Sequence, residues 1–96
     1  MEIRWSPEAA ADFTAMIHYI QQDNSSAALR VARTIYQNVA QLKVFPNRGR
    51  PGRVDGTREL PIPRLPFVVV YRVGESAVEV ARLLHGAQRW PPIYED

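Results

Sequence analysis

The chain has 96 residues and a mass of 10.9 kDa, the size of one small domain with one hydrophobic core. Its 46% hydrophobic and 23% charged residues, with a net charge of +2, argue against intrinsic disorder. It has no cysteine, which excludes disulfides and thiolate metal sites, and no apolar run long enough to cross a bilayer. We therefore expect a single domain over residues 1–96 that lies in the cytoplasm, with no membrane partner.

The sequence begins with a strand and a helix. Alternating residues over Glu2–Trp5 predict a short strand. Ser6 followed by Pro7 is typical of a helix start, because a hydroxyl caps the first turn and proline suits the first helical position. Apolar residues then recur at three- and four-residue spacing, which extends this helix to about Gln22.

A second amphipathic helix follows a break at Asp23-Asn24. Ser25 or Ser26 is expected to cap it, and it should end near Phe45 because Pro46 cannot continue it. Two helices with a short polar joint form a helical hairpin.

The residue composition of the chain changes after the second helix. Residues Pro46–Gly56 combine two prolines, three glycines and four charges, which predicts an exposed loop that carries its arginines on the surface. Runs rich in β-branched and aromatic residues predict three strands, over Thr57–Ile62, Phe67–Val73 and Val78–Leu84. Gly74-Glu75-Ser76 should join the last two strands as a tight hairpin.

These elements predict an α+β fold of order β-α-α-β-β-β. A helical hairpin packs on one face of a small, mainly antiparallel sheet, and the tail over residues 85–96 is extended. Strict alternation divides the last strand into two faces. One face holds Val78, Val80, Arg82 and Leu84, and the other holds Glu79, Ala81, Leu83 and His85. Arg82, set among valines, should reach out from the rim of the sheet.

Arginine dominates the positive charge. Eleven of the twelve basic residues are arginine, whose planar fork suits phosphates and carboxylates, and only Lys43 is lysine. From Lys43 to Arg64 there are six basic residues and two acidic ones, a local net charge of +4. Such a stretch suits an anionic partner, but it is also typical of a solvated, solubilising surface.

Few residues offer catalytic chemistry. The histidines, His18 and His85, have no carboxylate cluster at ligand spacing, so neither a metal site nor a cofactor is expected. His85, at the end of a strand and near arginines, could act as an acid or base toward a phosphodiester, or could cap the strand by bonding to the backbone.

Five segments, in order along the chain, carry a family resemblance. They are Trp5–Asp12, Phe45–Arg53, Gly56–Leu60, Val70–Val73 and Leu84–Pro91. Together they resemble the RelE/ParE superfamily of toxins from type II toxin–antitoxin modules. The resemblance implies a growth-inhibiting toxin of the kind associated with plasmid stabilization, which a cognate antitoxin neutralises in a toxin–antitoxin hetero-oligomer.

The superfamily has two unlike activities. RelE-like members are ribosome-dependent endonucleases that cut mRNA, whereas ParE-like members poison DNA gyrase without cleaving RNA. The RNA-cleaving branch generally carries an arginine three residues before the tyrosine of the strand equivalent to Phe67–Val73. Counting back from Tyr71 gives Val68, which cannot stabilise phosphoryl charge. The resemblance therefore favours a ParE-like gyrase poison. A RelE-like mRNA endonuclease is the alternative, and an RNA-binding regulator without toxicity is a third reading.

The site residues depend on which activity holds. If the protein cleaves mRNA, the catalytic candidates are His85, Arg82 and Glu59. The candidate target-binding residues are Arg48, Arg50, Arg53, Arg58, Arg72, Arg82, Arg89 and Trp90.

Overall fold

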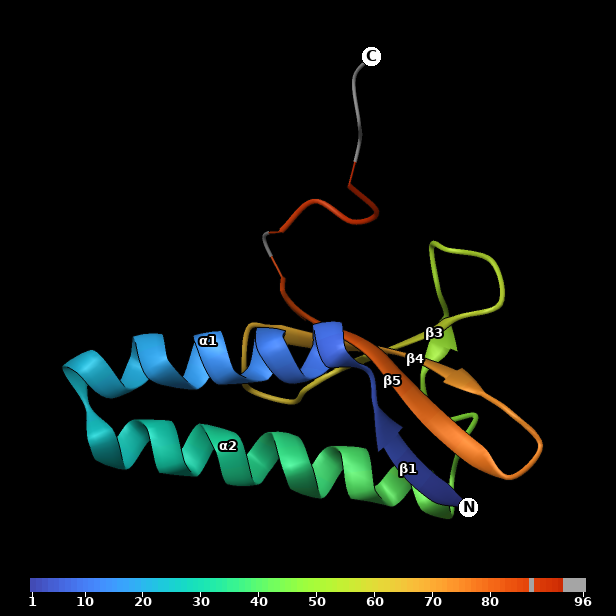
Figure 1. Ribbon diagram of the computed structural model, residues 1–96, viewed down its shortest axis with the longest axis horizontal. Helices are drawn as coiled ribbons and strands as arrows, with labels where there is room; N and C mark the ends of the chain where they lie inside the picture. The colour runs from blue at the N-terminus through green and yellow to red at the C-terminus, as the bar shows by residue number, and fades with distance from the viewer. Residues whose placement is uncertain (87, 93–96) are drawn as a thin grey trace.

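The computed structural model has two antiparallel helices packed against a five-stranded sheet (Figure 1). It describes residues 1–86 and 88–92. The elements are β1 (Glu2–Trp5), α1 (Pro7–Asp23), α2 (Ser25–Ala40), the 3-10 turn η1 (Gln41–Lys43), β2 (Arg50–Pro51), β3 (Arg58–Pro61), β4 (Phe67–Val73) and β5 (Ala77–His85). This order confirms the predicted α+β fold. Within the expected extended tail, residues 86 and 88–92 form neither helix nor strand, and residues 87 and 93–96 lie outside the described part of the chain.

The helix starts follow the predicted chemistry, with one correction. The Oγ of Ser6 accepts a hydrogen bond from the Ala9 backbone N–H at 3.0 Å, and it also donates to the carbonyl of Ala81 in β5 at 2.8 Å. The predicted serine cap of the second helix is wrong, because Asn24 takes that position and accepts from the N–H of Ala27 at 3.0 Å. The Asn24 N–H also closes α1, so one residue ends one helix and starts the next.

The second helix ends earlier than predicted. The α-helix stops at Ala40, not near Phe45, and the chain tightens into η1 before Pro46. Helices commonly end in such a turn, because bonds of the i to i+3 type satisfy carbonyls that would otherwise lack partners. The backbone N–H groups of Val44 and Phe45 both donate to the Gln41 carbonyl, at 3.1 and 2.9 Å.

The sheet order is β1-β5-β4-β3-β2, so the first and last strands are neighbours. β1 pairs with β5 in parallel, and the other three pairings are antiparallel, as expected for a mainly antiparallel sheet. β2 was expected to be loop. Its two residues pair with Arg58 and Glu59 of β3, and a strand that short gives no periodic signal.

A bulge in β5 corrects the predicted faces of that strand. Val70 pairs with Arg82, but the next residue of β4, Tyr71, pairs with Val80, which leaves Ala81 unpaired. An extra residue of this kind reverses the alternation beyond it. Leu83 therefore joins Val78 and Val80 in the core, while Arg82 and Leu84 face the other side of the sheet.

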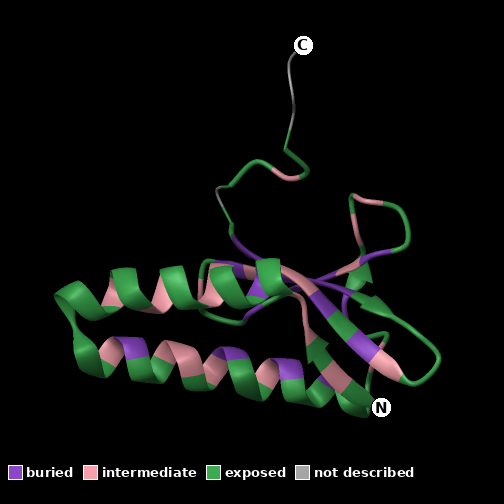
Figure 2. Cartoon of the chain, viewed as in Figure 1, coloured by how far each residue is buried: buried purple, intermediate pink, exposed green. Residues whose placement is uncertain are grey.

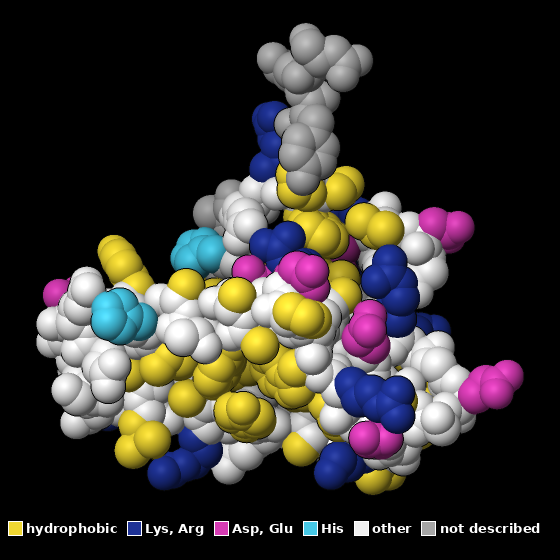
Figure 3. All heavy atoms as spheres, in the orientation of Figure 1, with side chains coloured by type: hydrophobic (Ala, Val, Ile, Leu, Met, Phe, Trp, Pro, Cys, Tyr) yellow, Lys and Arg dark blue, Asp and Glu magenta, His cyan; other side chains and the backbone are white. Residues whose placement is uncertain are grey.

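The core lies between the helical hairpin and the sheet (Figure 2). α2 contributes Ile35 and Val39, and the sheet contributes apolar residues from its three longest antiparallel strands. On the face seen in Figure 3, apolar side chains gather along the seam between the helices. Trp5, Phe13 and Tyr36 form an aromatic cluster there, with ring centroids 5.2–5.6 Å apart. Within the described residues, no helix is both long and apolar enough to cross a membrane.

Candidate functional site

Glu59 is the centre of the first group of predicted site residues. Its side chain is 1% exposed and its Oε2 accepts from the backbone N–H of Arg53 at 2.8 Å. The Arg53 guanidinium donates to both carboxylate oxygens, at 3.2 and 3.0 Å, and Arg50 donates to Oε1 at 3.3 Å. The two arginine side chains remain 57% (Arg50) and 50% (Arg53) exposed. A buried carboxylate thus holds two arginines whose outer surfaces face solvent.

This network sets the ionisation of Glu59. Burial by itself would raise the pKa of the carboxyl, but the hydrogen bonds from Arg53 and Arg50 outweigh it and hold the pKa below its ordinary value. Glu59 is therefore a stable anion. Arg50 and Arg53 are exposed, as predicted for this loop, and their bonds to Glu59 also tie the loop to β3.

The start of the same loop is fixed by Tyr71 and Arg58. The Tyr71 hydroxyl donates to the Pro46 carbonyl at 2.7 Å and accepts from the Gly49 N–H at 2.8 Å. The Arg58 guanidinium donates to the carbonyls of Gly49, at 2.7 Å, and Asn47, at 3.3 Å. Gly49 must be glycine here, since a Cβ would lie 2.8 Å from the Tyr71 ring. Arg58, a predicted target-binding residue, thus bonds to the backbone of its own chain.

Arg82 is held by Asp12 of α1. Its Nε and Nη2 donate to the Asp12 carboxylate at 2.7 and 3.2 Å, and the Leu83 N–H donates to the same carboxylate at 3.0 Å. The guanidinium lies over the ring of Trp90, 5.4 Å from its centroid, a cation–π arrangement. The expectation that Arg82 reaches out from the sheet rim is therefore wrong, because β5 lies inside the sheet and the guanidinium bonds to Asp12. This clamp, composed of Asp12, Arg82 and Trp90, joins α1, β5 and the segment after β5.

A cleft of about 260 Å³ lies beside the clamp, between Trp90 and the end of the loop over residues 46–56, called the arginine loop below. Within the described part of the chain, the indole Nε1 of Trp90 is buried without a hydrogen-bond partner. Arg72, a predicted target-binding residue, lines this cleft and pairs across the strands with Glu79. The cleft is lined by Ser6, Glu8, Val54, Thr57, Val70, Arg72, Glu79, Ala81, Arg82 and Trp90.

His85 lies on the other side of the sheet. Arg82 and Glu59 both pair with Val70, so they share its face, whereas His85 pairs with Phe67 on the core face. The His85 and Phe67 rings meet edge to face, with centroids 5.8 Å apart. The strand register therefore places Glu59 and Arg82 in one row on the same face of the sheet, and it places His85 on the opposite face.

Beside His85 lies an apolar groove of about 390 Å³ between α1 and the ends of β4 and β5. Its main apolar residues are Met16, Tyr19, Ile20, Phe67 and Leu83.

A family model described as the ParE toxin of the type II toxin–antitoxin system parDE matches residues 3–90. The chain belongs to this ParE toxin family. Two curated relatives are also named as toxins. The protein Y4kP of Sinorhizobium fredii is 36% identical over 91 residues, covering 95% of this chain and 94% of its own. Toxin RelE2 of Caulobacter vibrioides is 31% identical over 87 residues, covering 91% and 97%.

Solved structures show the same ParE fold. A structure titled as the chromosomal ParDE toxin–antitoxin system from P. aeruginosa matches with a TM-score of 0.78 and 31% identity, over 88% of this chain and 95% of that chain. The YoeB dimer of Staphylococcus aureus matches with a TM-score of 0.55 over 85% and 92% of the two chains. At 18% identity, YoeB supports the fold alone.

Val68 is the position at which this ParE family member departs from the RNA-cleaving pattern given above. It lies on the same face of β4 as Val70, between Pro61 of β3 and Leu84 of β5. The row across the sheet at this point is therefore apolar, with no cation to stabilise developing charge on a phosphoryl group.

Sequence reasoning missed Asp12 as a site residue. Asp12 lies in Trp5–Asp12, the first of the five segments with the family resemblance, immediately before Phe13, one of the regularly spaced apolar residues of the helix. The sequence did offer one signal. Asp12 is a carboxylate next to the apolar face of the first helix, and that helix packs on a strand that contains an arginine. Of the other predicted target-binding residues, Arg89 is exposed in the segment after β5, and Arg48 is exposed at the start of the arginine loop.

Proposed function

We propose that the protein is a ParE-like toxin that arrests growth by poisoning DNA gyrase and does not cleave RNA. The apolar row of Pro61, Val68 and Leu84 carries this proposal, because RNA-cleaving relatives generally carry an arginine, which stabilises phosphoryl charge, where Val68 stands. The separation of His85 from Glu59 and Arg82 supports it, since an acid–base pair must reach the same phosphodiester. The match to the ParE family adds further support.

The test compares the two activities directly. The purified protein is added to a gyrase supercoiling reaction and, separately, to a translation reaction analysed by primer extension on the mRNA. We expect inhibition of supercoiling and no specific cuts in the mRNA. Cuts at the ribosomal A site, with supercoiling unchanged, would overturn the proposal and leave only the toxin family assignment.

We also propose that a cognate antitoxin silences the toxin by inserting an amphipathic segment into the apolar groove between α1 and the ends of β4 and β5. The groove offers exposed apolar surface at Tyr19 beside half-buried Met16 and Ile20, which suits a segment that folds on binding. The similarity to the ParDE structure of P. aeruginosa supports a partner of this kind.

The alternative activity, a RelE-like endonuclease, is favoured by one relative, Toxin RelE2, and by the exposed His85. The variant His85→Ala separates the two. Loss of a general acid or base typically lowers a rate by about a hundred- to ten-thousand-fold, so an endonuclease would lose mRNA cleavage. A gyrase poison needs no proton transfer from this side chain, and we expect inhibition to stay within a few-fold of the wild-type value.

A further inference from the structure

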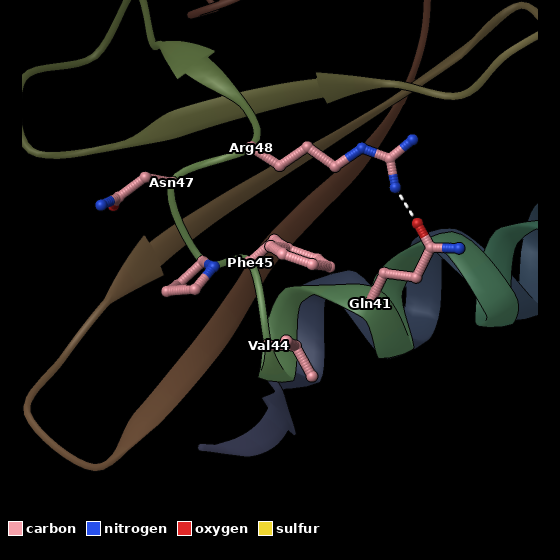
Figure 4. A pocket seen from close by; sticks show the side chains of 6 residues that line it. Gln41, Val44, Phe45, Asn47 and Arg48 are labelled. Atoms are coloured by element: carbon pink, nitrogen blue, oxygen red, sulfur yellow. Dashed lines mark hydrogen bonds between the residues drawn. The ribbon is translucent and has the colours of Figure 1, made fainter.

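Val44 and Phe45 form an exposed apolar surface that none of the functions described above uses. We call it the Val44–Phe45 step. Their exposed fractions are 71% and 63%, although they are adjacent hydrophobic residues of a folded segment. They lie in a shallow groove of about 690 Å³ together with Gln41, Pro46, Asn47 and Arg48 (Figure 4). Contiguous exposed apolar side chains rimmed by polar ones are typical of interaction sites.

The backbone that carries this step is rigid. On one side η1 holds it, because the N–H groups of Val44 and Phe45 share the Gln41 carbonyl. On the other side Tyr71 bonds to the Pro46 carbonyl, and Arg58 bonds to the Asn47 and Gly49 carbonyls. The buried side chain of Tyr71 and the half-buried side chain of Arg58 therefore hold an apolar surface in solvent. A surface fixed in this way loses little conformational entropy when a partner binds.

The chain segment that carries the step has charge of one sign. From Asn24 to Val54 the sequence contains no acidic residue, but it contains five arginines and Lys43. Lys43 precedes the step, and Arg48 lies at its edge, bonded to the side-chain oxygen of Gln41 (Figure 4).

We propose that the Val44–Phe45 step docks an acidic, amphipathic segment of the protein that this toxin inhibits. An apolar anchor of that segment covers Val44 and Phe45, and its carboxylates face Lys43 and Arg48. This inference rests on the proposed function, because it requires a protein target. The step shares no residue with the apolar groove assigned to the antitoxin, so the two surfaces can be altered independently.

The experiment compares Phe45→Ser with Leu29→Ser. Leu29 is a matched control, since it is 61% exposed on α2 and lies outside the step. Three readouts are taken with each full-length variant: growth arrest without antitoxin, affinity for purified gyrase, and affinity for the antitoxin. We expect Phe45→Ser to weaken gyrase binding roughly 30-fold, as loss of an interface hot spot does, and to relieve growth arrest. Leu29→Ser should match the wild type, and antitoxin affinity and melting temperature should hold in both variants.

Two outcomes would overturn the inference. Growth arrest and gyrase affinity equal to wild type in Phe45→Ser would show that the step is not a docking surface. Loss of activity with Arg48→Glu but not with Phe45→Ser would indicate contact with a nucleic acid, not an amphipathic protein segment. Failure of the proposed function gives a different result, namely a wild-type protein that arrests growth yet neither binds nor inhibits gyrase. In that case, growth arrest is compared between Phe45→Ser and Leu29→Ser. Relief of arrest with Phe45→Ser alone would show that the step contacts the true target, and equal arrest would show that it does not.

Discussion

Glu59 shows how a buried anion can organise cations at the surface. Its carboxylate is buried, and the two arginines bonded to it, Arg50 and Arg53, keep about half of their side chains exposed to solvent. The arginines are thus held in position by contacts with their own chain, so a partner that bound them would meet them already in place. They pay less in side-chain entropy on binding than freely rotating arginines would.

We predict that Arg53→Ala destabilises the fold, whereas Arg48→Ala does not. Removing Arg53 takes two side-chain hydrogen bonds from a buried carboxylate and should lower the free energy of unfolding by about 1–3 kcal/mol. Arg48 is exposed, so its loss should change stability by less than about 0.5 kcal/mol. Urea unfolding of both variants measures the difference. Equal stabilities would mean that Arg50 alone satisfies Glu59.

We predict a matching dependence of stability on pH. Because folding lowers the pKa of Glu59, the folded state favours the ionised form, and this stabilisation is complete above the ordinary pKa of 4.5. It is lost as the pH falls through the lowered pKa. Unfolding curves at pH 7 and pH 3.5 should therefore differ less for Glu59→Gln than for the wild type. An identical pH dependence in the two proteins would contradict this assignment.

At the scale of elements, the clamp of Asp12, Arg82 and Trp90 links three parts of the chain that are far apart in sequence. One carboxylate of α1 bonds to both the side chain of Arg82 and the backbone of Leu83 in β5. Arg82 in turn lies over Trp90. The segment after β5 forms neither helix nor strand in its described residues, and this contact helps to hold it against the sheet.

We predict that Asp12→Asn loosens Trp90 from the sheet. The amide carries no charge to pair with Arg82, so the guanidinium should leave its position over the indole. In a Trp5→Phe background, where Trp90 is the only tryptophan, emission should shift to the red and quenching by acrylamide should increase. Asp23→Asn, at the exposed end of α1, is the control. Unchanged Trp90 emission in the Asp12 variant would show that the clamp does not hold the segment.

The elements that sequence could predict were those with a long periodic signal or a strong local rule. The two helices, β1, β4 and the hairpin before β5 follow from spacing, the Ser6-Pro7 start and turn chemistry. The bulge at Ala81 could not be predicted, because one unpaired residue leaves no mark on composition yet reverses the faces of Arg82 and Leu84.

The candidate site was less predictable than the fold. Arginine content is what singled out the loop after Pro46. Nothing in the sequence showed that Arg53 bonds to Glu59 or that Arg58 bonds to the backbone, because both contacts depend on the pairing of β2 with β3. The catalytic candidates were chosen by residue type, and only the strand register shows that His85 and Glu59 lie on opposite faces.

At the scale of the whole molecule, the two helices project beyond the sheet as a long hairpin (Figure 1). The groove assigned to the antitoxin lies where α1 meets the ends of β4 and β5, and the Val44–Phe45 step follows α2. The two proposed partners therefore have separate surfaces.

We predict that the antitoxin restores growth on co-expression and raises the melting temperature. At a hundred times its Kd, a ligand stabilises the folded state by about 2.7 kcal/mol. Each kcal/mol moves the melting temperature of a domain this small by about 4–8 °C, so a rise of roughly 10–20 °C is expected. Tyr19→Glu, in the groove, should abolish the rise, while Leu29→Glu should retain it. A full rise with Tyr19→Glu would place the antitoxin elsewhere.

The position of β5 has a consequence for the timing of synthesis. β5 is the last strand of the sheet to leave the ribosome, yet it lies between β1 and β4 and supplies Val78, Val80 and Leu83 to the core. The hydrogen bond from the Ser6 hydroxyl to the Ala81 carbonyl also forms only after β5 has been made. A nascent chain that does not yet include β5 cannot complete the sheet, however long translation pauses. For a toxin of this family, that order delays activity until β5 has been synthesised and can pair with β1 and β4.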